Sequence, residues 1–439
     1  MKKLNIETYG CQMNIADSEV VASILAEHFE ITENQKEADL ILLNTCSVRD
    51  NAEQRIRKRL RELGSLKKKN STLLIGLLGC MAERVKEQLL TEEKALDFIA
   101  GPDAYRSLPQ LIEEASKGKL SFNVLLSEEE TYDDIAPIRY DGNGISAFIP
   151  IMRGCNNFCS YCIVPYTRGR ERSRDPKTII QEATQLFENG YKEITLLGQN
   201  VNSYLWKENA TPMDFADLME QMALISPLLR VRFATSHPKD ISEKLIHTIA
   251  KYPNICKYIH LPVQSGSTAV LKKMNRVYNR EYYLERIQTI KNVIPDIALS
   301  TDILSGFCGE TEQDHQDTLS IMRIVEFSSA FMFRYSVREG TKASDKFEDD
   351  VPDEVKARRL EEIIALQQEL SLENNKKDIG KVFEVLVEGV SKRSDKKMYG
   401  RNSQNKVCVF PREEAKIGDY IHVKVTQCTA GTLLAEIVK

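Results

Sequence analysis

The chain has 439 residues, 42% of them hydrophobic and 28% charged, which is the composition of a folded globular protein. This composition excludes disordered, collagen-like and disulfide-scaffold classes, and the length suggests about three domains. The net charge of −4 excludes a general polyanion binder, although residues 376–439 carry thirteen Lys and Arg against eight Asp and Glu, a weak indication of a nucleic-acid partner for that part.

The first 120 residues predict an open parallel sheet with helices on its faces. Short apolar runs alternate there with stretches of helical periodicity, which is the pattern of β-α units. We expect strands at 4–9, 40–44, 73–78 and 98–101, and helices at 18–29, 51–66, from about 82 and at 105–117. Asn14 or Asp17 is the expected cap of the first helix. Residues 127–144 are acidic and rich in turn residues, so we expect a linker there.

A second β-α series predicts a parallel barrel that is only partly closed. Its six predicted strands are at 148–152, 193–197, 231–234, 257–261, 298–303 and 330–335, with helices between them, for example at 177–188, 242–251 and 282–293. Six repeats are fewer than the eight that close a full (β/α) barrel. A long charged helix at 352–376 ends the series, so we place this domain at residues 141–375.

Residues 376–439 change to a period of two, which predicts a small antiparallel β-barrel. The expected strands are at 382–388, 406–410, 420–426 and 433–438. The segment 392–401 is expected to be a basic loop, and such a loop on a small barrel suits an RNA backbone and unstacked bases. The candidate RNA contacts are Lys392, Arg393, Lys396 and Lys397. An ordinary surface loop is the alternative.

The predicted fold is therefore α/β with three domains, at residues 1–120, 141–375 and 376–439. The longest apolar run, at 73–82, is about half the length that spans a bilayer, and no secretory signal is evident. We expect a cytoplasmic protein without a membrane partner. In that reducing compartment the ten cysteines serve metals or redox chemistry more often than disulfides.

Three cysteines, Cys155, Cys159 and Cys162, follow a predicted strand with the spacing C-x-x-x-C-x-x-C. Three thiolates from one short loop can hold an iron–sulfur cube and leave its fourth iron without a protein ligand. Zinc is the alternative, but zinc sites usually complete four ligands, and no histidine lies in this loop. We therefore expect a 4Fe-4S cluster with one open iron.

Cys11, Cys46 and Cys80 occupy equivalent positions in three successive β-α units. Each follows the carboxyl end of a predicted strand, and ligands collect at those ends in an open parallel sheet. The pattern predicts a second 4Fe-4S cluster, again with an open iron. Three buried small hydrophobic residues are the alternative, because free cysteine is often simply part of a core.

The motif at Cys155, with Tyr161 before its last cysteine and a six-repeat β/α domain behind it, resembles the radical S-adenosylmethionine (SAM) enzymes. Two cysteine triads in this order, followed by a β-rich tail, resemble the methylthiotransferases over nearly the whole chain. In that family a three-cysteine domain precedes a radical SAM barrel and a small TRAM domain. The segments 8–14 and 44–49, Thr-Tyr-Gly-Cys-Gln-Met-Asn and Asn-Thr-Cys-Ser-Val-Arg, are similar to the branch that acts on isopentenyladenosine at position 37 of tRNA.

The resemblance implies two 4Fe-4S clusters and two SAM molecules per turnover. The auxiliary cluster on the early cysteines would present sulfur that one SAM methylates. A second SAM at the later cluster would yield the 5′-deoxyadenosyl radical that attacks carbon 2 of the adenine. The implied partners are tRNA bearing N(6)-isopentenyladenosine, a reductant such as flavodoxin or ferredoxin, and a sulfur donor. No catalytic side chain is expected beyond the clusters.

Two alternatives stay open at this point. Other groups of the same family act on threonylcarbamoyladenosine in tRNA or on an aspartate of a ribosomal protein. A protein of another class, a non-catalytic iron–sulfur RNA-binding or redox-sensing protein, is the second alternative. Such cluster proteins normally have a protein ligand on every iron, so two sites of only three cysteines each favour the enzyme.

Two sets of polar residues complete the predicted site. The candidate SAM contacts lie in the cysteine loop or near the ends of barrel strands: Tyr161, Gln199, Asn200, Ser236, Gln264 and Asp302. Each of the five near strand ends could equally be a strand-end cap. Four arginines follow the cysteine loop within seven residues: Arg168, Arg170, Arg172 and Arg174. They could bind tRNA phosphates or a SAM carboxylate, and the alternative is a salt-bridged face.

Overall fold

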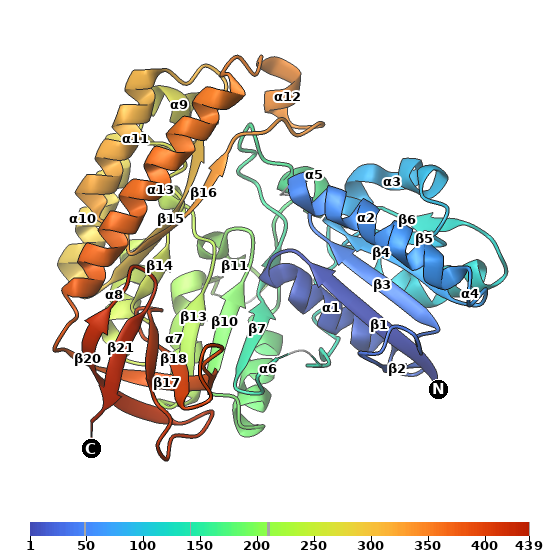
Figure 1. Cartoon of the computed structure of the whole chain (residues 1–439), viewed down its shortest axis with the longest axis horizontal. Coiled ribbons are helices and arrows are strands. Elements are labelled where there is room, and N and C mark those ends of the chain that lie inside the picture. Colours follow the sequence, from blue (N-terminus) through green and yellow to red (C-terminus); the bar gives the residue numbers. More distant parts are fainter. Residues whose placement is uncertain (48–49, 141, 209–210, 439) are drawn as a thin grey trace.

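The structure, a computed structural model, describes residues 1–47, 50–140, 142–208 and 211–438 (Figure 1). It is an α/β protein whose N-terminal sheet domain and C-terminal β-barrel lie on different sides of a central partial barrel. Within these residues no helix combines the length and the apolar character needed to cross a membrane.

The N-terminal sheet has six parallel strands in the order β2-β1-β3-β4-β5-β6. The strands are β1 (Lys2–Tyr9), β2 (Phe29–Ile31), β3 (Leu40–Thr45), β4 (Leu74–Gly79), β5 (Phe98–Ala100) and β6 (Ser121–Asn123). The helices are α1 (Gln12–Leu25), α2 (Asp50–Lys67), α3 (Cys80–Glu92), the 3-10 helix η1 (Tyr105–Ser107) and α4 (Leu108–Ser116). The four predicted strands are confirmed. The sequence did not predict the short strands β2 and β6, whose three residues each are too few to show alternation.

Both faces of this sheet are covered, which explains why β3 is apolar over four successive residues. Leu40 and Leu42 pack in a core that includes side chains of α1 and α4, whereas Ile41 and Leu43 pack with those of α2 and α3. A strand whose side chains are buried on both sides needs no polar positions until it reaches its end.

The start of α1 differs from the prediction. The helix begins at Gln12 with Cys11 as its N-cap, and it ends at Leu25. Asn14 lies inside the first turn, where its Oδ1 accepts a hydrogen bond from the backbone N of Cys11 (3.4 Å). Asp17 is also inside the helix and is buried. The predicted caps were wrong because these polar residues bind buried partners from other elements instead of marking a helix end.

The central domain holds six parallel strands in two three-stranded sheets. They are β7 (Ser146–Pro150), β10 (Glu193–Leu197) and β13 (Arg230–Phe233), then β14 (Tyr258–His260), β15 (Ala298–Ser305) and β16 (Ser329–Arg334). A parallel bridge from Val231 to Ile255 links the two sheets. Among the described residues β7 does not pair with β16, so the predicted partly closed barrel is confirmed.

Helices cover the outside of this barrel (Figure 1). The helices are α5 (Val164–Arg168), α6 (Pro176–Glu188), α7 (Phe215–Ile225), α8 (Glu243–Lys251), α9 (Thr268–Lys273), α10 (Arg280–Val293), α11 (Glu312–Val325), α12 (Lys342–Lys346) and α13 (Asp353–Lys376), with the 3-10 helices η2 (Val201–Ser203) and η3 (Pro238–Asp240). Two short pairs complete the domain, β8 (Met152–Arg153) with β9 (Arg172–Ser173) and β11 (Leu205–Trp206) with β12 (Met213–Asp214).

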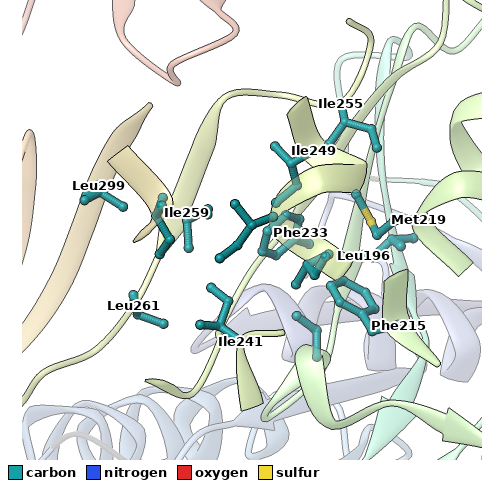
Figure 2. Close-up of a cluster of buried hydrophobic side chains, with 14 of the residues drawn as sticks. Leu196, Phe215, Met219, Phe233, Ile241, Ile249, Ile255, Ile259, Leu261 and Leu299 are labelled. Carbon is teal, nitrogen blue, oxygen red and sulfur yellow. The ribbon is translucent and has the colours of Figure 1, made fainter. Parts of the chain in front are cut away.

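Figure 2 shows part of the barrel core, in which Phe233 of β13 lies near Leu196 of β10 and Phe215 of α7. Phe233 is 3% exposed and meets the Phe215 ring edge-on at 5.4 Å. We expect Phe233→Ala to lower the free energy of unfolding by about 3 to 5 kcal/mol, because removal of the ring leaves a cavity. The matched control is Leu224→Ala on α7, where the side chain is 61% exposed, with an expected change below about 0.5 kcal/mol. Urea unfolding followed by circular dichroism measures both, and equal midpoints would contradict this account.

The C-terminal domain is a closed barrel of five strands in the order β17-β18-β19-β21-β20. They are β17 (Val382–Val390), β18 (Lys397–Asn402), β19 (Val407–Pro411), β20 (Tyr420–Cys428) and β21 (Leu433–Ile437). The small barrel is confirmed with two differences. β19 and β21 pair in parallel, and the second half of the predicted basic loop is strand β18. Met398, Gly400 and Asn402 alternate inward along that strand, a pattern that the charges before it obscured.

This barrel packs against the amino ends of the central strands. Nη1 of Arg230 donates to the carbonyl O of Arg401 (2.7 Å), and Nη2 of Arg232 donates to that of Asn402 (2.7 Å). Tyr420 Oη donates to the carbonyl O of Lys192, just before β10 (2.9 Å). The C-terminal barrel is therefore fixed at the end of the central barrel opposite to the carboxyl ends of its strands.

Candidate functional site

The strand register of the N-terminal sheet brings its three cysteines together. Tyr9 pairs with Thr45, and Thr45 pairs with Gly79, so the three strands end at the same level. Cys46 and Cys80 directly follow their strands, and Cys11 lies two residues after β1. A side-chain hydrogen bond joins Cys11 to Cys46, and Cys11 lies close enough to Cys80 to raise the pKa of Cys80 electrostatically. Residues 44–49 are the segment that is similar to the isopentenyladenosine branch. Its last two residues, Val48 and Arg49, lie outside the described residues.

The charges around this early triad favour a thiolate. The hydrogen bond with Cys46 and the positive charge of Arg168 outweigh burial and lower the pKa of Cys11 to about 6. Burial raises the pKa of Cys80, although Arg168 opposes it. The thiolate is the form of cysteine that binds metal, so the metal-free triad already holds one ligand in its binding form at neutral pH.

We expect alkylation of the metal-free, reduced chain to begin at Cys11. Iodoacetamide should modify Cys11 half-maximally near pH 6, because only its thiolate reacts and the pKa is lowered to about 6. Burial raises the pKa of Cys155 to about 11 and of Cys162 to about 12, so these two should remain unmodified at pH 7. Peptide mass spectrometry across a pH series measures each site, and equal labelling of the three at pH 7 would contradict the prediction.

The later triad lies in the loop between β8 and α5, which folds back on itself. Gly154 has a φ of 78°, and a Cβ there would lie 1.9 Å from the carbonyl O of Arg170, so only glycine fits. The backbone N of Cys155 donates to the carbonyl O of Gly169 (3.1 Å), and that of Cys162 donates to Cys159 (3.0 Å). These bonds hold the three cysteines in one compact loop.

A buried arginine that the sequence did not point to contacts this loop. Arg276, 8% exposed, donates from Nη1 to Sγ of Cys159 (3.3 Å). Its other nitrogens donate to the carbonyl O of Pro262 and to Tyr278 Oη, both at 2.9 Å. Arg276 follows Asn275, whose φ of 58° turns the chain after α9, and no sequence pattern predicts that turn.

The predicted SAM contacts include buried polar atoms that lack a partner. Gln199 Oε1, Asn200 Oδ1 and Ser236 Oγ are buried and make no hydrogen bond within the described chain, and Ser305 Oγ at the end of β15 shares this property. Nδ2 of Asn200 donates to Asp240 (2.7 Å). Buried polar groups are normally hydrogen-bonded, so such a set at strand ends fits a polar ligand such as SAM.

The other three candidates lie near the same strand ends. Gln264 follows β14 with a φ of 70°, and its backbone N donates to the carbonyl O of Asp302 (2.9 Å). Asp302 Oδ1 lies 3.4 Å from Nε2 of His260. Tyr161 packs edge-on against Phe307, with ring centroids 6.3 Å apart. The left-handed backbone of Gln264 is strained for a residue with a side chain, and such strain is concentrated at functional sites.

The arginine run is mostly buried, which corrects the prediction that all four residues could contact RNA. Arg168, Arg172 and Arg174 are 3%, 7% and 6% exposed. Arg168 pairs with Asp17 (2.8 Å), Arg172 with Asp103 (2.9 Å) and Arg174 with Glu182 (2.6 Å). Only Arg170 is exposed, with its guanidinium 5.4 Å from the centre of the Phe158 ring. The salt-bridged alternative therefore describes three of the four.

Two of these ion pairs, those of Arg168 with Asp17 and of Arg172 with Asp103, join the N-terminal domain to the central barrel. Asp17 of α1 also binds Nη1 of Arg153 (2.9 Å), two residues before Cys155. Burial alone would raise the pKa of Asp17, but the charges of Arg153 and Arg168 outweigh it and hold that pKa below the ordinary carboxyl value. One buried carboxylate thus ties the loop of the later triad to the helix that follows Cys11.

Two further groups of charged residues differ in their exposure and pairing. The basic residues Lys392, Arg393, Lys396 and Lys397 are all exposed, as an RNA contact requires. Within the described residues one group, Glu312, His315 and Glu362, has the spacing of a single-ion site. Arg358 pairs with both of its carboxylates, at 2.7 and 2.5 Å, and Nη2 of Arg359 lies 3.3 Å from Glu312, so each carboxylate already has a cationic partner.

Three family models match the chain. The first is described as uncharacterized protein family UPF0004 and matches residues 3–101, the second is the radical SAM superfamily at residues 149–322, and the third is the TRAM domain at residues 376–438. The first match covers β1 to β5 with all three early cysteines, the second runs from the end of β7 to α11 and includes the later triad, and the third covers the five-stranded barrel.

Curated relatives named tRNA-2-methylthio-N(6)-dimethylallyladenosine synthase are similar along the whole chain. The relative from Amoebophilus asiaticus is 57% identical and covers 99% of this chain and 92% of its own length. The relative from Phocaeicola vulgatus is 56% identical, with 100% and 96% covered. Among solved structures, the radical S-adenosylmethionine methyltransferase TsrM from Kitasatospora setae, with cobalamin and a [4Fe-4S] cluster bound, has a TM-score of 0.58 at 12% identity over 78% of this chain and 77% of that chain. That likeness concerns the fold.

Proposed function

This chain belongs to the tRNA-2-methylthio-N(6)-dimethylallyladenosine synthases, a family of radical SAM methylthiotransferases, and we propose that it adds a methylthio group to carbon 2 of N(6)-isopentenyladenosine at position 37 of tRNA. The relatives that support this assignment span nearly the full chain. Action on threonylcarbamoyladenosine or on a ribosomal-protein aspartate, and a non-catalytic iron–sulfur protein, are not favoured.

The observation that carries the proposal is the pair of cysteine triads on two joined domains. Cys11, Cys46 and Cys80 would hold one 4Fe-4S cluster, and Cys155, Cys159 and Cys162 the other, each with three thiolates and an open iron. When bound, the clusters supply transferable sulfur at the early triad and the electron that cleaves SAM at the later one. The thiols of the two triads suit cluster binding, because the pKa of Cys11 is lowered to about 6 and Nη1 of Arg276 donates a hydrogen bond to Sγ of Cys159.

The side chains around the later triad would orient SAM. The unpartnered atoms of Gln199, Asn200 and Ser236 offer hydrogen bonds to its polar groups. Tyr161, Gln264 and Asp302 complete the proposed contacts. No described side chain is assigned a proton transfer, because carbon 2 of adenine is neither acidic nor electrophilic enough for acid–base catalysis. The protein binds, orients and excludes water.

We place the functional domains at residues 1–120, 141–375 and 376–439, with the RNA-binding surface on the last. The loop before β18 carries Lys392, Arg393 and Lys396, and Lys397 begins that strand, whereas the other end of β18 binds the central barrel. This loop would therefore bind a part of the tRNA other than the reacting base. Exposed Arg170, in the segment that follows the cysteine loop, is the remaining RNA candidate near the site.

We expect alanine at all four of these loop positions to weaken tRNA binding about 10-fold or more at physiological salt, because each cation releases counterions from the phosphates. The slope of log affinity against log salt should become shallower by about 1 for each phosphate that the variant no longer binds. Lys424→Ala is the control, an exposed lysine on β20, which does not neighbour β18. Filter binding across a salt series measures both, and an unchanged slope would contradict the assignment.

The remaining partners follow from the proposed chemistry. SAM cleavage needs an electron from a reductant such as flavodoxin or ferredoxin, and transfer of cluster sulfur needs a donor that replenishes it. Two SAM molecules would be used in each turnover, one for the methyl group and one for the radical. A tRNA-modifying enzyme of this kind would work in the cytoplasm.

The direct test uses the full chain, reconstituted with iron and sulfide without oxygen. It is incubated with SAM, dithionite and tRNA that carries N(6)-isopentenyladenosine at position 37, and the digested nucleosides are analysed by mass spectrometry. The expected result is the 2-methylthio derivative. The same tRNA without the isopentenyl group, or with threonylcarbamoyladenosine, is the matched control. Product on either control but not on the isopentenyl substrate would overturn the assignment.

A further inference from the structure

Arg168 reaches from the central barrel into the early cysteine triad. It is the last residue of α5, in the same domain as the later triad, yet its Nε donates to Sγ of Cys80 at 3.1 Å. Its Nη2 donates to Asp17 of α1 at 2.8 Å. The side chain is 3% exposed, so its charge is removed from water and placed against the candidate ligands.

The third nitrogen of this guanidinium is also buried but has no partner. Arg168 Nη1 makes no hydrogen bond with any residue that the structure describes. An unsatisfied buried donor is costly unless a ligand occupies it.

The later triad has an equivalent arrangement. Arg276 is buried, donates to one sulfur of its triad, Cys159 at 3.3 Å, and uses its remaining nitrogens on neighbouring oxygens. Each triad therefore has one buried arginine that hydrogen-bonds one of its three sulfurs. The difference is that Arg276 belongs to the domain of its own triad, whereas Arg168 crosses from one domain to the other.

We propose that Arg168 is a positioning residue of the early metal site, which orients Cys80, completes that site only when the two domains are joined, and raises the reduction potential of the cluster bound there. The proposal rests on the proposed function, in which the early triad holds a 4Fe-4S cluster. Hydrogen bonds and positive charge near cluster sulfurs stabilise the more negative, reduced state. The unpartnered Nη1 adds a donor for an anionic sulfur ligand beside the same cysteine.

The experiment isolates the early cluster in the full-length chain. Cys155, Cys159 and Cys162 are replaced by alanine, and the background protein is reconstituted with iron and sulfide. Iron analysis and a redox titration followed by electron paramagnetic resonance are then performed on this background and with Arg168→Met, Arg168→Lys or Arg172→Met added. Arg172 is the matched control, since it is buried and pairs with Asp103 across the same interface without contacting a cysteine.

We expect Arg168→Met to shift the midpoint potential to more negative values, Arg168→Lys to shift it less because the charge is kept, and Arg172→Met to leave it unchanged. Loss of iron with Arg168→Met but not with Arg172→Met would also support the proposal. An unchanged midpoint with Arg168→Met, or the same shift or iron loss with Arg172→Met, would overturn it. Absence of about four iron atoms per chain in the background alone would overturn the proposed early cluster, and this proposal with it.

Discussion

Replacing Cys155, Cys159 and Cys162 with alanine is expected to abolish SAM cleavage by the reconstituted full-length chain. The expected yield of 5′-deoxyadenosine equals that of a protein-free mixture, because in the proposed function the electron that cleaves SAM would come from a cluster held by these three thiolates. The unpartnered polar groups at the ends of β10, β13 and β15 are amides and hydroxyls, which cannot donate an electron. Liquid chromatography of the mixture after incubation with SAM and dithionite measures the loss.

A matched variant separates the role of the thiolates from a general effect of losing cysteine. Cys256 is 2% exposed and lies in the same domain, but it follows Ile255 at the amino end of β14, at the opposite end of the barrel. Cys256→Ala is expected to keep SAM cleavage near the wild-type level. Full cleavage by the triple variant, or equal loss in Cys256→Ala, would contradict the assignment of the later triad.

The early site could be predicted because its geometry follows from strand register alone. Three cysteines that end three neighbouring parallel strands must meet at one edge, and Tyr9, Thr45 and Gly79 are indeed paired in the structure. The later triad is a local motif and needs no tertiary information. The later triad is thus encoded by a local motif. The early triad is encoded by a β-α unit that the chain repeats three times.

The arginines could not be assigned in the same way. The sequence around Arg168 shows a dense positive run, and nothing in it indicates that Asp17, 151 residues earlier, binds one member. Arg276 likewise reaches Cys159 across 117 residues. A run of positive charge indicates that its partner is negatively charged, but not where along the chain that partner lies. The choice between a salt-bridged face and a nucleic-acid contact therefore required the fold.

Strand β18, which the sequence did not predict, has a related explanation. β18 begins at the end of a basic segment, and its inward positions include Gly400 and Asn402, which an apolar alternation does not detect. They are buried because the closed barrel and the central domain meet there, where Arg232 binds the carbonyl of Asn402. Tertiary contacts, not local propensity, decide the structure of such a segment.

Replacing Cys11, Cys46 and Cys80 with alanine should separate the two halves of the proposed reaction. SAM cleavage is expected to continue, because the later triad, the hydrogen bond from Arg276 to Cys159 and the unpartnered atoms of Gln199 and Asn200 are unchanged. Methylthiolation is expected to fall to background, because no described cysteine is left at the edge where β1, β3 and β4 end. The two products are measured in one mixture, as 5′-deoxyadenosine and as the 2-methylthio nucleoside after digestion of the tRNA.

The ratio of the two products distinguishes a misfolded variant from one that has lost only the sulfur site. A misfolded variant would lose both, whereas loss of the sulfur site alone leaves 5′-deoxyadenosine without methylthiolated tRNA. Cys408→Ala, a buried cysteine in the core of the C-terminal barrel, is the control and should preserve the wild-type ratio. Methylthiolated tRNA at the wild-type level from the triple variant would show that sulfur comes from elsewhere. The early triad would then be a structural group of buried thiols, and the parallel register that gathers it would have no part in the chemistry.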